Sequence, residues 1–162
     1  MSVEKVKAYL SQWNLQDQVH ELDQSSATVP LAAQAIGVIP ARIAKTLSFQ
    51  GQEGCILLVA AGDAKVDNAK FKAQFHLKAK MLTPEQALEW TGHAVGGVCP
   101  FAIENPQVQV YLDVSLRRFD TVFPACGSSN SMIQLTCDQL QETSRAVGWV
   151  DVCKGWQEEN AQ

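Results

Sequence analysis

The sequence lacks the long apolar segments that membrane insertion or secretion would require. Its longest apolar block, residues 55–61, is far shorter than the roughly 20 residues that cross a bilayer. Glu4, Lys5 and Lys7 lie near the N-terminus, and no apolar run of signal-peptide length follows them. We therefore expect a cytoplasmic protein that has no membrane partner.

Paired cysteine motifs are also missing. The chain has five cysteines, an odd number, and no two are spaced as C-x-x-C. This pattern excludes a zinc ribbon and a thioredoxin motif, and it favours reduced thiols. Cysteines and histidines are separated by tens of residues for the most part, so we expect no metal site and no cofactor.

Familiar catalytic motifs are absent as well. The chain contains no G-x-S-x-G elbow, no P-loop and no G-x-G-x-x-G fingerprint. His93 and Cys99 lie close in sequence beside a glycine loop, which leaves two interpretations open. They form a Cys–His nucleophile pair, or Cys99 is a small apolar residue of the core.

Positive charge is scarce and unevenly placed. With 13 Lys+Arg, 17 Asp+Glu and a net charge of −4, the 162 residues do not suit a protein that coats nucleic acid non-specifically. The length and the 46% hydrophobic content indicate a single folded domain over residues 1–162. Lysines gather in residues 64–80, either as a solvated face or as a local basic patch for a phosphate backbone.

The predicted helices and strands are interleaved along the chain. Apolar spacing and capping residues predict helices over 3–13, 29–36 and 69–75, from 84 to about 92, and from 137 to about 147. Residues 45–50 and 55–61 flank a Gly-bounded loop and form a predicted hairpin. Strands are also expected at 108–112, 121–123 and 132–135. This interleaving favours a mixed α/β or α+β sheet over a doubly wound parallel one.

Three short segments remain as a candidate ligand site. Lys45 opens a strand, where it either reaches solvent or presents a point charge to a phosphate or carboxylate. Gly96, Gly97 and Gly127 lie in two constrained loops whose backbone N–H groups can approach a small polar ligand. The residues alone thus indicate a site made largely of backbone, with no evident side-chain catalyst.

At these positions the chain resembles the YbaK/EbsC-type family, free-standing relatives of the editing domain of bacterial prolyl-tRNA synthetase. The resemblance runs from about residue 3 to 152. It rests on A-K-T-L at 44–47, L-V-A-A-G-D at 58–63 followed by V-D at 66–67, T-G-H-A-V-G-G-V-C-P-F at 91–101, and V-Y-L-D at 110–113 followed by the loop at Gly127.

The resemblance implies an aminoacyl-tRNA deacylase that acts in trans, after the synthetase has released a mischarged tRNA. The implied fold is an α/β fold with a twisted, mostly antiparallel or mixed sheet, partly closed around a pocket and flanked by helices. The implied partners are the aminoacyl-tRNA acceptor end and, as a candidate, a cognate aminoacyl-tRNA synthetase. Positioned water or a substrate hydroxyl would attack the ester, without a metal.

The same resemblance suggests roles for individual residues. Lys45 would hold the 3′-terminal phosphate and the ester, Gly96 and Gly97 would line the aminoacyl pocket, and Asp113 would position the site. Further expected substrate contacts are Leu22, Thr46, Val98, Pro100, Gly127 and Ser128. The expected tRNA-docking residues are Lys65, Lys70, Lys72 and Arg117.

The chain departs from the family pattern at positions that bear on substrate choice. Leu22 stands where some cysteinyl-specific relatives have tyrosine, and the Asn and His of some alanyl-specific relatives are not evident. The amino acid and the tRNA therefore stay open. Three hypotheses remain: an editing hydrolase, a non-catalytic tRNA- or synthetase-binding module, and a thiol enzyme that uses Cys99.

Overall fold

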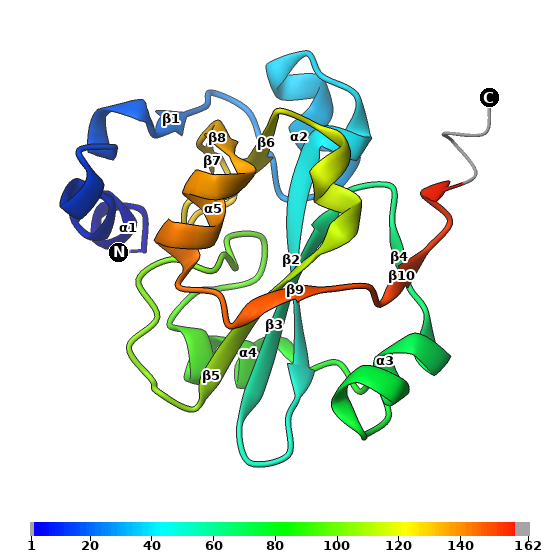
Figure 1. The fold of residues 1–162 in the computed structure, drawn as a ribbon. Helices are drawn as coiled ribbons and strands as arrows, with labels where there is room; N and C mark the ends of the chain where they lie inside the picture. The colour runs from blue at the N-terminus through cyan, green and yellow to red at the C-terminus, as the bar shows by residue number, and fades with distance from the viewer. Residues whose placement is uncertain (1, 158–162) are drawn as a thin grey trace.

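A computed structural model describes residues 2–157 (Figure 1). Its α-helices are α1 (Ser2–Leu10), α2 (Val29–Ile36), α3 (Asn68–Phe75), α4 (Pro84–Thr91) and α5 (Cys137–Ser144). Short 3-10 helices are η1 (Ser11–Trp13), η2 (Gln16–Gln18), η3 (Pro40–Arg42) and η4 (Val114–Arg118). The strands are β1 (His20–Glu21), β2 (Ile43–Gln50), β3 (Cys55–Ala61), β4 (Lys65–Val66), β5 (Val108–Asp113), β6 (Thr121–Pro124), β7 (Ser131–Met132), β8 (Leu135–Thr136), β9 (Gly148–Val150) and β10 (Cys153–Lys154).

A curled six-stranded sheet forms the centre of the molecule, with the strand order β8-β6-β2-β3-β5-β9. The β2–β3 hairpin and the β6–β8 pair are antiparallel, whereas β2–β6, β3–β5 and β5–β9 are parallel. The expected mixed α/β fold with flanking helices is confirmed, with more parallel pairing than a mostly antiparallel sheet would have. Short antiparallel pairs join β1 to β7 and β4 to β10.

Local capping signals set most helix ends. Thr83 and Thr136 each form a complete capping box with the glutamine three residues later, as their sequences predict. Gly37 and Gly92 end α2 and α4 in the left-handed conformation, where glycine costs least. Asp67 caps α3 by accepting two backbone N–H groups.

Two predicted helices end earlier than expected. Residues 3–13 divide into α1 and the 3-10 turn η1, after which Asn14 adopts a left-handed conformation. The C-terminal helix stops at Ser144, because Arg145 takes the left-handed position expected near Gly148. Predicted strand 132–135 is also divided, since β7 pairs with β1 and β8 with β6.

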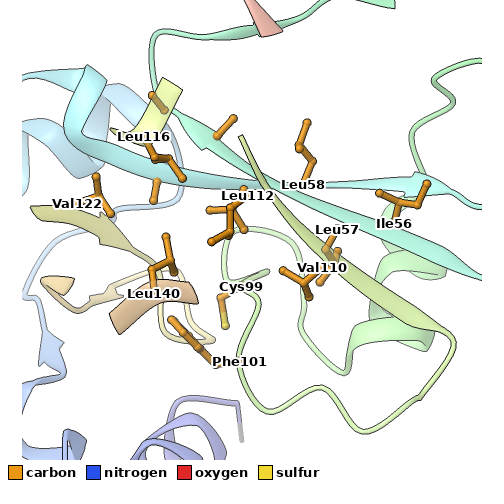
Figure 2. Close-up of a cluster of buried hydrophobic side chains, with 14 of the residues drawn as sticks. Ile56, Leu57, Leu58, Cys99, Phe101, Val110, Leu112, Leu116, Val122 and Leu140 are labelled. Atoms are coloured by element: carbon orange, nitrogen blue, oxygen red, sulfur yellow. The ribbon is translucent and has the colours of Figure 1, made fainter. Parts of the chain in front are cut away.

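The hydrophobic core lies on both faces of β3, whose seven residues are all buried. Figure 2 shows Leu57 and Leu58 of β3 near Val110 and Leu112 of β5, with Phe101 nearby. Burying a leucine or phenylalanine side chain contributes about 1.5–3 kcal/mol. The central strands are therefore a rigid support for the segments at the sheet's edge.

Candidate functional site

A pocket of about 440 Å³ opens beside β2, where the strand loses its neighbours on one side. β6 pairs with β2 only at Ile43 and Ala44. Farther along, Met81 forms an isolated bridge with Phe49, and the Leu82 N–H donates to the carbonyl of Ser48 at 3.0 Å. Residues 45–47 therefore face a gap between these two partners, and all three line the pocket.

The chemistry of the pocket wall is simple. Most lining side chains are small or apolar, several carry hydroxyl groups, and Lys45 supplies the positive charge. Among the described residues, no aspartate or glutamate lines this pocket. The wall thus suits a small uncharged group attached to an anion or to a developing oxyanion.

Two helix N-termini reinforce the positive potential of this wall. Thr28 and Val29 of the α2 start and Thr83 and Pro84 of the α4 start all line the pocket. The N-terminal end of a helix carries a partial positive charge, which favours a nearby anion. The sequence predicted both helix starts but not their convergence, because that depends on tertiary packing.

Lys45 is held at the pocket by backbone oxygens. Its ammonium donates to the carbonyls of Gly62, at 3.3 Å, and Ala64. Burial lowers its pKa from the ordinary lysine value, an effect partly offset by Cys153 and Asp63. A charged donor whose carbonyl partners carry only partial charges keeps a net positive charge to offer a ligand.

The turn that holds Lys45 is itself clamped. Asp63, between the two carbonyl residues, receives both ends of the Arg118 guanidinium at 3.0 and 2.6 Å. The same guanidinium lies over the rings of Phe119 and Trp156, at 4.9 and 5.1 Å from their centroids. Bidentate Arg–carboxylate pairs add geometric specificity, so this pair fixes the position of the Lys45 ammonium.

The two glycine loops contact each other next to Gly96, which lines the pocket. A Cβ on Gly97 would lie 2.6–2.7 Å from backbone atoms of Gly127 and Ser128. The Gly97 N–H is already used, since it donates to the Ala94 carbonyl at 3.0 Å. Gly96, at φ +88°, lines the pocket itself. Gly97 therefore shapes the wall rather than donating to a ligand.

Thr46 has a feature that no pattern in the sequence revealed. Thr46 is one of the residues that line the pocket, and its hydroxyl oxygen is buried and has no hydrogen-bond partner among the described residues. An unmade hydrogen bond at a buried hydroxyl costs about 1–3 kcal/mol. A ligand group that reached this oxygen and bonded to it would recover that cost.

The other expected substrate contacts lie at different depths. Val98 lines the pocket, whereas Leu22 is not among the lining residues and packs against a second apolar cluster that includes Met132. Pro100 is buried outside the lining, and the Ser128 hydroxyl bonds within its own loop, to Ser131 at 2.7 Å.

Asp113 is fully buried away from the pocket wall. One carboxylate oxygen accepts the Ser115 N–H and the other accepts the Val152 N–H, both at 2.9 Å. These bonds join β5 to η4 and to the segment before β10. The structure therefore gives Asp113 a supporting role, and any effect on the reaction stays a prediction.

His93 and Cys99 do meet, but inside the core. The Cys99 Sγ lies 3.5 Å from His93 Nε2, which also lies 2.8 Å from the Phe101 carbonyl. Burial raises the pKa of Cys99 to about 12 and lowers that of His93. Figure 2 shows Cys99 among the buried apolar side chains. This setting argues against a thiolate nucleophile and favours the core interpretation.

The four expected docking residues differ in the partners that they already have. Lys65 and Lys72 are exposed, but Lys70 pairs with Asp151 at 3.2 Å. The guanidinium of Arg117 lies 4.2 Å from the ring centroid of Trp149, on the strand at the far edge of the sheet.

Two further features are absent from residues 2–157. No group of three or more His, Cys, Asp or Glu side chains there could hold a metal ion. No helix in the same range has the length and apolar content needed to cross a membrane.

Comparison with known proteins identifies the family. The profile of the aminoacyl-tRNA editing domain matches residues 23–143. The uncharacterized protein YwhH of Bacillus subtilis is 54% identical over 158 residues, which cover 97% of this chain and 100% of that protein. The proline–tRNA ligase of Thermotoga maritima is 33% identical over 95 residues, 57% of this chain but only 16% of the ligase.

Solved structures agree with this assignment. A crystal structure of a candidate trans-editing enzyme for prolyl-tRNA synthetase superposes with a TM-score of 0.85 and 30% identity, covering 95% of this chain and 98% of that one. The hypothetical protein APE2540, at 24% identity and a TM-score of 0.77, shares the fold. The chain belongs to the aminoacyl-tRNA editing domain family.

Proposed function

We propose that this protein is a hydrolase that removes the aminoacyl group from mischarged tRNA in trans, in the cytoplasm. The observation that carries the proposal is the pocket at the open edge of β2, where Lys45, Thr46 and two helix N-termini converge. This is a binding site for an anion joined to a small uncharged group. An aminoacyl ester next to a terminal phosphodiester has that chemistry.

The reaction requires only a modest lowering of the activation barrier by the protein. An aminoacyl ester is already activated, so positioning and charge stabilisation can supply the required lowering of the barrier. Lys45 would hold the terminal phosphate or the developing oxyanion, and the Thr46 hydroxyl would orient the attacking water or substrate hydroxyl. A second hydrolytic step is needed because a synthetase pocket separates similar small amino acids by only about 1–3 kcal/mol.

A panel of mischarged tRNAs tests this function. We expect the ester of a small uncharged amino acid to decay faster with the protein than in buffer, and esters of charged amino acids to decay at the buffer rate. A cognate aminoacyl-tRNA synthetase is the candidate partner that would supply the substrate. Saturable binding of tRNA or of a synthetase, with no accelerated decay of any ester, would instead identify a binding module.

Thr46→Val should lower the deacylation rate and preserve or raise the melting temperature. Valine has nearly the same shape, so the substitution removes a buried hydroxyl that has no hydrogen-bond partner within residues 2–157. Loss of one hydrogen bond in the transition state predicts a rate loss of about threefold to tenfold. Single-turnover deacylation and thermal unfolding, measured on the same preparation, give the two values.

The matched control is Thr143→Val. Thr143 is buried as well, but its hydroxyl donates to the Gln139 carbonyl at 2.7 Å and lies outside the pocket lining. We expect this variant to lose stability and keep its rate per folded molecule. If Thr46→Val loses stability and keeps its rate in the same way, the Thr46 hydroxyl has no part in the reaction.

A further inference from the structure

Residues 68–84 carry four lysines and no carboxylate, in a protein of net charge −4. Asp151 neutralises one of them, Lys70. Lys72, Lys78 and Lys80 are exposed, and none forms an ion pair within the described part of the chain. We call these three residues the lysine strip.

The strip borders a concave surface at the first turn of α3. Lys72 and Lys78 line a hollow of about 400 Å³ together with Asn68, Ala69 and Ala79. Two lysines without an ion-pair partner among the described residues and one asparagine thus border this hollow. Lysine acts as a flexible point charge, which suits a phosphodiester whose orientation is not tightly defined.

The strip runs directly into the wall of the pocket. The Gln50 N–H donates to the Lys80 carbonyl at 2.8 Å, and the next residue, Met81, is bridged to Phe49. Met81 and Leu82 then line the pocket. A polyanion lying on the strip would therefore have its end at the pocket mouth.

We propose that the lysine strip binds the phosphates of the tRNA acceptor end and directs the aminoacylated 3′ terminus into the pocket. This inference rests on the proposed function, because the pocket must receive the ester. The strip extends the expected docking residue Lys72 toward the pocket through Lys78 and Lys80. It also explains how an acidic protein can bind RNA at one place, since three unpaired charges give weak, salt-dependent contacts.

The test compares two double variants that remove the same charge. Lys78→Gln/Lys80→Gln removes most of the strip, and Lys5→Gln/Lys7→Gln removes two lysines of α1, which lies across the molecule from α3 (Figure 1). The probe is a fluorescent RNA microhelix that ends in CCA. We expect the first variant to bind about tenfold more weakly at low salt. Its salt slope should fall by roughly 0.7–0.9 for each lost phosphate contact.

An adenosine aminoacyl ester, which has no stem, separates this proposal from the proposed function. Both variants should hydrolyse it at the wild-type rate, while Lys78→Gln/Lys80→Gln is slower on the whole tRNA. Equal loss of microhelix binding in both variants would refute the RNA-binding role of the lysine strip. Binding to phosphatidylserine vesicles that depends on these lysines, without binding to RNA, would refute it as well. If wild-type protein binds the microhelix through the strip but hydrolyses no ester, only the proposed function fails.

Discussion

Replacing Lys45 by alanine should reduce the deacylation rate by about 100-fold or more, because removing one donor placed at a developing charge has an effect of this size. Lys45 provides the only ammonium in the pocket wall formed by the described residues. Its partners, the carbonyls of Gly62 and Ala64, keep it in place before substrate arrives. Single-turnover hydrolysis of the best substrate in the panel measures the loss.

Two further variants show whether charge or folding accounts for that loss. Lys45→Met keeps the chain length without the ammonium and should be as slow as Lys45→Ala. Lys7→Ala, on α1, removes a lysine outside the pocket and should keep the wild-type rate. Because burial already disfavours the charged form of Lys45, its loss should change the melting temperature little. A wild-type rate in Lys45→Ala would refute the role assigned to the ammonium.

Gly97→Ala should lower both stability and activity. The new Cβ would lie 2.6 Å from the carbonyl carbon of Gly127 and 2.7 Å from Ser128 N, so the two loops must separate. Overpacking of this kind costs about 1–3 kcal/mol. A shift near 1 Å in a positioning wall can cost about 100-fold in rate. Thermal unfolding and single-turnover kinetics measure the two effects.

Gly148→Ala is the matched control for that substitution. A Cβ at Gly148 would meet no atom of the described residues within 4 Å, and Gly148 lies on β9, outside the pocket lining. Neither glycine has a positive φ, so the comparison isolates steric contact from backbone strain. We expect Gly148→Ala to match the wild type. Equal behaviour of the two variants would mean that the glycine-loop contact does not shape the site.

Signals within a few residues of each other predicted much of the fold. Three kinds of feature depend only on neighbours in sequence. They are the capping boxes at Thr83 and Thr136, the glycine that ends α4 at Gly92, and the hairpin around residues 51–54. The sequence also indicated Lys45 and the two glycine loops as a candidate site, and in the structure Lys45 and Gly96 line the pocket. Such features are readable because their energies arise locally.

Local sequence signals did not predict which distant strands pair with each other. The parallel pairs β2–β6 and β3–β5 join strands separated by tens of residues, and no turn residue specifies them. The early end of α5 at Ser144 followed from Arg145 entering the left-handed region instead of the expected Gly148. Sequence periodicity does not reveal which of two nearby residues takes that position.

The candidate site shows most clearly which features local sequence predicts and which depend on tertiary structure. Local sequence was enough to indicate Lys45, Gly96 and Gly97 as candidate site residues. It was also enough to show that the chain has no recognisable catalytic-triad motif. Tertiary structure decided that Asp113 supports the core, and that Cys99 is buried with its pKa raised.

Tertiary structure also decided which groups remain available to a ligand. It paired Lys70 with Asp151 and brought two helix N-termini to one gap in the sheet. It also gave the Thr46 hydroxyl no hydrogen-bond partner in the part of the chain that the structure describes. The physical reason is that residue type sets what a side chain can do, whereas burial and distant partners set whether it is free to do it.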